Sequence, residues 1–477
     1  MVAVSLKKIP HLSSISRIAK DRNIGVWLVG GFLRDSYLKL KKELVDFDFC
    51  VGKETLAVVK DFAKSISSKF IVLDKSQKSY RVVKKEKNKV YTYDFTAMRG
   101  KNLEEDLALR DFTINTLTVS LLDKKLELID HLKACKAMKD KIITVARDEV
   151  IAQDPLRILR GFSFVANYGF KINSRTLSLM VKYKQLIKQV SKERINEELF
   201  KILASDNSYK VIKLIDKLRI LDQFIPEIAK MRGIDQPGGY HHLEVWEHSL
   251  ETLRQFELFC TKQIGKNKEM ANYLFEELAV GRRRIQIIKL ACLFHDIGKP
   301  KAKKKLKGKT IFHTHEKIGK EITEKIADNL RLSLHEKNIL TKLIFWHLRP
   351  GYLADQVHPS RRAVYRFFRD TQEEGVAVIL LSFSDWRATR GPLTNNKKRK
   401  RHEVIMLNLA DKYFIDKKKK PLPKIIDGKI IMKKYKIPSG PLIGVILKKI
   451  KEEQALGKTS TKSEALKRAK QIITKAS

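Results

Sequence analysis

The sequence predicts an α+β protein in which a small mixed β-sheet head is followed by an all-helical neck, body and tail. Three observations lead to this prediction. The chain has 477 residues, of which 43% are hydrophobic, and this length favours more than one hydrophobic core. Short apolar or alternating runs are concentrated before residue 100. From about residue 136 the apolar residues recur with the 3.6-residue period of helices.

The strands of the head are expected from short runs bounded by turn residues. Residues 26–31 (VWLVGG) form a strand that ends in two glycines, and FLRDSYLKL after them has helical spacing. Residues 45–51 (VDFDFCV) alternate apolar and acidic side chains. Three further strands are expected at 68–74, 80–85 and 89–98. The head is therefore a sheet with at least one helix packed on it.

The remainder of the chain is predicted to be helical and is divided at two changes of composition. Gly and Pro punctuate residues 232–242, and a basic run occupies 395–403. These boundaries give four segments: a head at 1–135, a helical neck at 136–234, a body at 235–395 and a basic helical tail at 396–477.

The charge balance suggests a polyanionic partner. Lys and Arg number 98 against 54 Asp and Glu, which gives a net charge of +44. Nucleic acid is the natural partner for such a chain, and a lysine-rich genome is the alternative explanation. The four cysteines form no close pair, so neither a zinc-thiolate site nor a disulfide framework is expected. Without an apolar run of about 18 residues, the chain is expected to be soluble, cytoplasmic and free of membrane contact.

An acidic pair in the head is the first candidate site. Asp46 and Asp48 are two residues apart on a predicted strand, so their carboxylates project from the same face. Two such carboxylates can hold Mg²⁺ ions, which prefer oxygen ligands and leave room for triphosphate oxygens. Upstream, Gly30 and Gly31 end a strand and Arg34 lies in the helix that follows, a layout suited to binding phosphate.

The combination of GGFLRD and DFDF on consecutive elements resembles the DNA polymerase beta superfamily, specifically the tRNA nucleotidyltransferase (CCA-adding) and poly(A) polymerase family. Asp46 and Asp48 would be its catalytic, Mg²⁺-binding residues, and Asp94 could approach the same metals. Residues 103–117 resemble the family's ribose-binding motif. By that likeness Arg110 contacts the triphosphate, and Asp111 and Asn115 contact the ribose. Leu109 stands where the family usually has arginine.

Residues 153–170 resemble the segment that selects the nucleobase in this family. Asp154, Arg157 and Arg160 would lie on one helical face, with a carboxylate accepting from the exocyclic amine of C or A and a guanidinium donating to the ring. Gln153 replaces the usual glutamate, which puts the orientation of Arg157 in question. Residues 193–203 match the next helical block, so the resemblance extends over about residues 25–205.

Histidine and aspartate recur in order through the body, which resembles an HD domain. The predicted metal ligands are His248, His295, Asp296, His315, His347 and Asp385. Imidazole and carboxylate ligands suit a divalent ion such as Mn, Ni, Co or Mg, which can activate water against a phosphoester. The resemblance implies a 2',3'-cyclic phosphodiesterase or phosphatase acting on RNA ends, or a scaffold for tRNA.

The function predicted from these resemblances is template-independent addition of C, A or both to the 3' end of tRNA from CTP and ATP, with no protein partner implied. The short connection TAMRGKNL (96–103) favours CC addition over full CCA addition. The alternatives are poly(A) polymerase, an HD-domain phosphohydrolase with a merely RNA-binding head, and a non-catalytic RNA-binding protein. The tail resembles the basic platform for the tRNA body found in HD-containing relatives.

Overall fold

The computed structural model describes residues 6, 9–40, 45–87, 89–123, 125–236, 242–279, 281–307, 309–392, 395–420 and 422–475. Two compact units are present: Met1–Ser205 with Leu214–Phe224, and Asp206–Lys213 with Ile225–Ser477. The four-segment division expected from the sequence stays a prediction. Residues 237–241, within the expected boundary at 232–242, lie outside the described residues.

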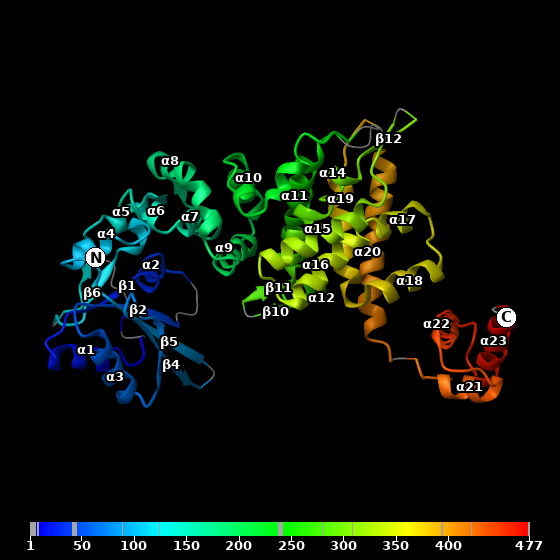
Figure 1. The fold of residues 1–477 in the computed structure, drawn as a ribbon, viewed down its shortest axis with the longest axis horizontal. Coiled ribbons are helices and arrows are strands. Elements are labelled where there is room, and N and C mark those ends of the chain that lie inside the picture. The colour runs from blue at the N-terminus through cyan, green and yellow to red at the C-terminus, as the bar shows by residue number, and fades with distance from the viewer. Residues whose placement is uncertain are drawn as a thin grey trace. The chain divides into compact units, whose positions relative to one another are not determined.

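A seven-stranded mixed sheet forms the centre of the first unit, in the order β3-β4-β5-β2-β1-β6-β7 (Figure 1). Its strands are β1 (Val26–Val29), β2 (Asp46–Val51), β3 (Phe70–Asp74), β4 (Ser79–Glu86), β5 (Lys89–Ala97), β6 (Thr118–Ser120) and β7 (Leu128–Ile129). Strands β2 and β5 are parallel, and the other neighbours are antiparallel. The predicted α+β class with a mixed sheet in the head is confirmed.

Aromatic side chains pack the sheet against its helices and determine which side chains of β2 are buried. Phe47 and Phe49 are buried, and Phe49 stacks on Phe95 of β5 at 4.9 Å between ring centroids. Helix α3 (Thr55–Ser65) contributes Phe62 to the same core. Since side chains alternate along a strand, burial of Phe47 and Phe49 turns Asp46 and Asp48 to the opposite face. The head helices are α1 (Leu12–Asp21), α2 (Gly31–Tyr37), α3, α4 (Leu103–Ala108) and α5 (Ala134–Lys139).

Helices α6 (Val150–Gln153), α7 (Leu156–Tyr168), α8 (Ser174–Tyr183), α9 (Lys192–Ala204) and α10 (Ser208–Lys217) follow the sheet. The expectation of purely helical structure after residue 136 is wrong in three places. Strand β8 (Ile142–Ile143) pairs with β9 (Lys171–Ile172), β10 (Glu277–Ala279) with β11 (Arg282–Arg283), and β12 (Lys304–Leu306) with β13 (Lys309–Ile311). Strands this short contain too few residues to establish a recognisable alternation.

The second unit is built around helices that are buried on all sides. Every residue of α13 (Arg284–Phe294) is buried, and α19 (Gly375–Ala388) is buried over most of its length. The surrounding helices are α11 (Val245–Gln263), α15 (His315–Asn329), α16 (Leu334–Trp346), α17 (Arg349–Asp355), α18 (Arg361–Thr371) and α20 (Asn396–Lys417) (Figure 1). Among the described residues, no helix is both long enough and apolar enough to cross a membrane.

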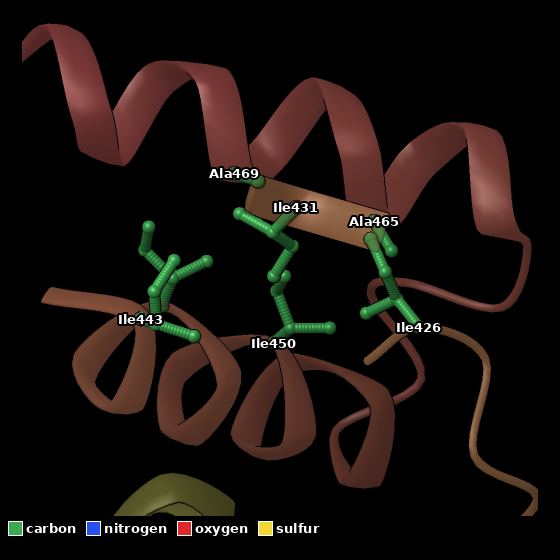
Figure 2. Close-up of a cluster of buried hydrophobic side chains, with 7 residues drawn as sticks. Ile426, Ile431, Ile443, Ile450, Ala465 and Ala469 are labelled. Atoms are coloured by element: carbon green, nitrogen blue, oxygen red, sulfur yellow. The ribbon is translucent and has the colours of Figure 1, made fainter. Parts of the chain in front are cut away.

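The chain ends in three helices with a small core of their own. Helices α21 (Gly428–Tyr435), α22 (Pro441–Ala455) and α23 (Lys462–Thr474) enclose the cluster drawn in Figure 2. Its buried members are Ile426, Ile431, Ile443, Ile446, Ile450, Ala465 and Ala469. Glu452 on α22 is buried and forms ion pairs with Arg362, Arg366 and Arg369 of α18. These ion pairs connect the three-helix cluster to the rest of the second unit.

We expect Ile446→Ala to lower the free energy of unfolding of this three-helix cluster by about 2–5 kcal/mol, because the substitution leaves a cavity in a small core. Ile446 is fully buried, whereas Val445 on the same helix is 55% exposed. Val445→Ala is therefore the matched control, with an expected change within about 0.5 kcal/mol. Hydrogen exchange over residues 428–474 measures both. Equal protection in the two variants would contradict the packing described here.

Candidate functional site

A cavity of about 770 Å³ in the first unit brings the predicted nucleotide-site residues together. It lies between the open face of the sheet and helices α7 and α9, which supply Arg157, Arg160 and Glu198. Every predicted catalytic or nucleotide-binding residue lines this cavity: Gly30, Gly31, Arg34, Asp46, Asp48, Arg110, Asp111, Asn115, Asp154, Arg157 and Arg160. Carboxylates and guanidinium groups therefore face one space of a size suited to a nucleotide.

The acidic wall of the cavity is formed by β2. Asp46 and Asp48 are both exposed while Phe47 between them is buried, as strand alternation predicts. The parallel register places Asp46 opposite Thr92 and Asp48 opposite Asp94, and the Thr92 hydroxyl donates to the Asp46 carboxylate. Enclosure by the surrounding protein raises the pKa of Asp48, and repulsion from Asp94 raises it further. A bound cation would relieve this repulsion.

Asp94, the third carboxylate on this wall, is held by an arginine. Both oxygens of Asp94 accept hydrogen bonds from Arg81 of β4, from Nε and Nη2, at 2.7 Å each. A bidentate pair of this kind fixes the carboxylate and occupies both of its oxygens. Asp46 and Asp48 are therefore better placed than Asp94 to hold a metal.

The glycine turn after β1 lies against the acidic wall. Gly30 has φ +79°, and a Cβ atom at this position would lie 3.0 Å from Oδ2 of Asp48. The turn therefore requires glycine both for its backbone conformation and for the close approach of the carboxylate. Gly31 follows as the first residue of α2.

We expect Gly30→Ala to weaken nucleotide binding in this cavity severalfold, because the new methyl group displaces the Asp48 carboxylate. The backbone strain alone should cost about 1–3 kcal/mol of stability. Gly169→Ala is the control, since Gly169 also has a positive φ, +67°, but has open space around its Cβ position. Calorimetric binding of CTP and thermal unfolding of both variants separate the two effects. Equal loss of binding in both variants would contradict a role for the Gly30 contact.

Arg34 is positioned by protein groups on all three of its guanidinium nitrogens. Nε donates to Asp35, Nη1 to Asn115 and Nη2 to the Tyr168 hydroxyl, at 2.8, 2.7 and 2.7 Å. The guanidinium also lies over the rings of Phe164 and Tyr168, at 5.0 and 4.8 Å. Arg34 thus joins α2 to α7 and adds positive charge to the lining of the cavity.

Asp111 and Asn115, the predicted ribose contacts, belong to the same network. Asn115 accepts from Arg34 and donates to Asp111 at 2.9 Å, and Asp111 forms an ion pair with Arg160 at 3.0 Å. Burial opposes ionisation of Asp111, but Arg160 and the hydrogen bond from Asn115 outweigh it and lower its pKa. Asp111 is therefore ionised and can accept a hydrogen bond from a hydroxyl group in the cavity.

Asp106 is a site residue that the sequence analysis did not identify. Its carboxylate is buried and accepts from the backbone N–H of Arg99 at 2.9 Å and from Nη2 of Arg110 at 3.1 Å. It thereby fixes the predicted triphosphate contact Arg110. The available signal was its position four residues before Arg110, a spacing that favours ion pairs in a helix. In the structure Asp106 is on α4 and Arg110 follows the end of that helix.

Asp154 does not lie on the same helical face as Arg157, and that expectation is wrong. Helix α6 ends at Gln153, Asp154 has extended backbone angles (φ −141°, ψ 93°), and α7 begins at Leu156. Pro155 accounts for the break, since the residue before proline avoids helical angles. The Asp154 carboxylate accepts from Arg194 of α9 at 2.8 Å, a pairing that the sequence analysis did not identify.

The orientation of Arg157 is set by two backbone carbonyls. Nη1 donates to Val150 O and Nη2 to Leu109 O, both at 3.1 Å. Neither bond uses the side chain of Leu109 or Gln153, the two positions that depart from the family pattern. Because a guanidinium has five N–H donors, these two bonds leave others for a base in the cavity.

The second unit holds the predicted His and Asp residues in one cluster, in which all but the half-buried Asp385 are buried. Two groups, each with ligand atoms within 4.8 Å of one another, have metal-binding composition: His248, His295 and Asp296, and Asp296, His315 and His347. Asp296 belongs to both. Its Oδ2 lies 3.3 Å from His295 Nε2, and its Oδ1 lies 3.3 Å from His315 Nε2. Asp385 lies 2.8 Å from His248 Nε2.

Several helices contribute to this cluster, and close packing brings them together. His248 is on α11, Asp385 is on α19, and His295 follows α13. Gly298 lies so close to α15 that a Cβ atom there would overlap the carbonyl oxygen of His315. The glycine thus allows His315 to approach Asp296.

The ring nitrogens and charges in the cluster suit metal binding. His295, His315 and His347 each direct Nδ1 to a backbone carbonyl, of Cys292, Phe312 and Ile344, at 3.0, 2.8 and 2.6 Å. Such bonds leave Nε2 for a metal. Burial, together with repulsion from His315 and His295, lowers the pKa of His347 to about 3, so its imidazole is neutral, as a ligand must be. Lys299, which the sequence analysis missed, donates to Asp296 at 2.7 Å.

Fold and site together define the class of protein: a nucleotidyltransferase head joined to an HD-type helical body. Three family models match in chain order, the "Poly A polymerase head domain" over residues 26–144, the "Probable RNA and SrmB-binding site of polymerase A" over 169–231, and the "HD domain" over 245–416. The chain belongs to the tRNA nucleotidyltransferase and poly(A) polymerase family, in its form with an HD domain.

Curated relatives resemble nearly the whole chain. A CC-adding tRNA nucleotidyltransferase of Thermus thermophilus is 29% identical over 92% of this chain and 91% of the relative. An A-adding tRNA nucleotidyltransferase of Deinococcus radiodurans is 27% identical over 92% of this chain and 94% of the relative. Among solved structures, the Thermotoga maritima CCA-adding enzyme complexed with tRNA has a TM-score of 0.64 at 19% identity, covering 99% of this chain and 97% of that chain. The structural likeness shows a shared fold.

Proposed function

We propose that this chain adds C, A or both, one nucleotide at a time, to the 3' end of tRNA, with CTP and ATP as donors. The observation that carries the proposal is the single cavity in which the paired carboxylates Asp46 and Asp48 face the base-selecting candidates Asp154 and Arg157. The activities named for the Thermus and Deinococcus relatives support it. The net charge of +44 suits a polyanionic substrate.

In the proposed reaction, the 3' hydroxyl of tRNA attacks the α-phosphorus of the incoming nucleotide. The bond to the β-phosphate breaks, and pyrophosphate leaves. Asp46 and Asp48 would hold two Mg²⁺ ions, and the all-oxygen donor set fits this metal. When bound, Mg²⁺ supplies charge stabilisation for the attacking and leaving oxygens. Arg110, fixed by Asp106, offers positive charge to the triphosphate.

The nucleobase is selected by side chains whose positions the protein fixes. Arg194 holds the Asp154 carboxylate, which is then available to accept from the exocyclic amine of C or A. Arg157, anchored to two backbone carbonyls, donates to the neighbouring ring atom. A uracil presents a carbonyl where the amine should be, and each unmatched polar group costs about 1–3 kcal/mol.

The connection after β5 supports CC addition within this class. It is short, and its backbone is bonded to α4: Arg99 N–H donates to Asp106 and Lys101 N–H donates to Glu105 at 2.9 and 2.7 Å. Asn102 caps the same helix by accepting from Glu105 N–H. A connection held by these hydrogen bonds has little freedom to change conformation between the addition of C and the addition of A.

The test uses three tRNA transcripts that end in the discriminator base, in C-C or in C-C-A, each with labelled CTP and ATP. Growth of the first transcript by two C residues that then stops indicates a CC-adding enzyme, and a further A indicates full CCA addition. Long A tails would indicate a poly(A) polymerase instead. Asp46→Ala is the control, and incorporation that survives this substitution would overturn the proposal.

A second activity is proposed for the His–Asp cluster, a metal-dependent phosphohydrolase acting on RNA ends. The observation that favours it is the pair of ligand groups that share Asp296. Imidazole nitrogens and carboxylate oxygens suit Mn, Ni, Co or Mg. When bound, such a metal lowers the pKa of a water molecule and makes it nucleophilic at neutral pH. Release of phosphate from RNA carrying terminal phosphates, compared between the parent and His295→Ala, tests this activity.

A further inference from the structure

One carboxylate of α22 meets three arginines of the neighbouring helix α18 (Figure 1). Arg362, Arg366 and Arg369 are spaced four and three residues apart, so they lie on one face of α18. Oxygens of Glu452 lie 2.9 Å from Nε of Arg362 and of Arg366, and 3.5 Å from Nη1 of Arg369. We call the three arginines the arginine stripe.

Positive charge exceeds negative charge along the arginine stripe. Within the described part of the chain, the carboxylates that pair with it are Glu452 and Asp370. Asp370 accepts from Arg369 at 2.8 Å and is shared with Arg349 at 3.0 Å. Two carboxylates therefore serve four guanidinium groups, and the excess charge favours a further anion.

The guanidinium groups are open to solvent, whereas the carboxylate between them is enclosed. The side chains of Arg362 and Arg366 are 44% and 45% exposed, and that of Glu452 is 5% exposed. Arg366 uses Nε and Nη2 for Glu452. Because a guanidinium has five N–H donors, each arginine keeps donors for an anion that arrives from solvent.

Glu452 differs from the other acidic residues of the three-helix cluster. Lys and Arg outnumber Asp and Glu by twelve to four in residues 426–474. Asp427 and Glu464 accept from backbone N–H groups at helix N-termini, and Glu453 pairs with an arginine of α23. Glu452 is thus the acidic residue through which a basic cluster contacts a basic helix. A polyanion in its place would relieve the repulsion between the two surfaces.

The Glu452 carboxylate occupies the place that a phosphate group would take. Hydrogen bonds from Arg366 lower the pKa of Glu452, so its carboxylate is ionised at neutral pH. Carboxylate and phosphate both present paired oxygens to the guanidinium fork. The stripe extends about 10 Å along α18, roughly the length that two or three phosphate groups of a nucleic acid strand cover.

We propose that the arginine stripe binds the phosphodiester backbone of RNA and that Glu452 occupies the stripe in the RNA-free protein. Glu452 is then an intramolecular competitor of RNA, and the affinity for RNA falls with the fraction of time for which the stripe is occupied. The inference rests on tRNA as the proposed substrate. It goes further by assigning a contact surface on the second unit and a limit on its affinity.

The test measures binding of a tRNA transcript that ends in the discriminator base, with the full chain and by fluorescence anisotropy. We expect Glu452→Gln to bind this RNA roughly three- to tenfold more tightly. This gain corresponds to a stripe that is free for about a third to a tenth of the time in the parent. Unchanged or weaker binding in Glu452→Gln would overturn the inference.

The matched control is Glu453→Gln, which removes the same charge from the same helix. Its ion pair lies within the three-helix cluster, so the affinity for tRNA should change less than twofold. An unfolded cluster would also expose lysines and bind RNA more tightly, but without any need for Arg366. Glu452→Gln combined with Arg366→Ala should therefore return the affinity to that of the parent or below. A gain that survives in this double variant would contradict the competition.

Inorganic phosphate is the second probe, because it has the same chemistry as the backbone. It should leave the gain in Glu452→Gln intact when it is added at the concentration of the RNA phosphate groups. If it abolishes the gain, the stripe is a site for a free anion and the RNA site is overturned.

Incorporation of CTP into the same transcript separates this inference from the proposed function. Tighter binding by Glu452→Gln without incorporation by the parent would overturn nucleotidyl transfer and leave the arginine stripe standing. Incorporation by the parent with equal RNA affinity in Glu452→Gln would overturn the arginine stripe alone.

Discussion

Asp48→Asn is expected to lower the rate of nucleotide incorporation roughly a thousandfold or more while leaving the head folded. Asparagine has the shape of aspartate but not its charge, so it should fail to hold Mg²⁺. A catalytic metal contributes several kcal/mol, and each 1.4 kcal/mol, roughly, corresponds to a tenfold change in rate. Single-turnover incorporation of CTP into tRNA measures the effect.

The matched control for this variant is Asp61→Asn. Asp61 is on α3 of the same unit, forms an ion pair with Arg22, and does not line the cavity. Its substitution should change the incorporation rate less than twofold, in keeping with the small value of exposed ion pairs. A similar loss in both variants, or an active Asp48→Asn enzyme with normal unfolding behaviour, would contradict the assignment of Asp48.

Asp296→Ala is expected to remove divalent metal from the whole His–Asp cluster. Its two oxygens face different histidines, with Oδ2 near His295 and Oδ1 near His315. Loss of one carboxylate therefore takes a ligand from both groups, whereas His347→Ala takes a ligand from one group only. Metal content after dialysis against Mn²⁺, measured by elemental analysis, should fall at least tenfold in Asp296→Ala and less in His347→Ala, since each ligand contributes to affinity.

Asp328→Ala serves as the control for metal content. Asp328 is an exposed carboxylate on α15 of the same unit and forms an ion pair with Lys337. Its removal should leave the metal content unchanged. Retention of the parent's metal content in Asp296→Ala would show that the ions bind elsewhere and would also undermine the phosphohydrolase proposal.

Local patterns in the sequence predicted five of the seven strands of the head sheet, β1 to β5. They did not predict β6 and β7, which contain too few residues for an alternating pattern to be recognised. Alternation along residues 45–51 predicted both the burial of Phe47 and the shared face of Asp46 and Asp48. In a strand with one buried face, side chains two residues apart lie on the same face of the sheet. The paired glycines predicted the turn at Gly30. The structure adds the reason that the turn needs glycine, which is the carboxylate of Asp48 beside it.

Hydrogen bonds between side chains far apart in the sequence could not be predicted from it. Tyr168 meets Arg34 across 134 positions, and Arg194 meets Asp154 across 40 positions. No local periodicity encodes such contacts, because they depend on how α7 and α9 pack. The break at Asp154 is different, because Pro155 in the sequence already indicated it. The helical pattern on both sides of this residue led instead to the prediction of one continuous helical face.

The two carbonyl bonds of Arg157 have a consequence for how this site tolerates change. A side chain that is anchored through the main chain keeps its direction whichever residues occupy positions 109 and 153, provided that the backbone there is undisturbed. Leu109 and Gln153 are then departures from the family pattern that leave the orientation of Arg157 unchanged, and with it the proposed selection of the base. Base preference should be vulnerable instead to changes that move the peptide groups themselves, such as proline near residue 109 or glycine within α6. The orientation of Arg157 therefore depends on the main-chain geometry at Val150 and Leu109 and not on the side chains at positions 109 and 153.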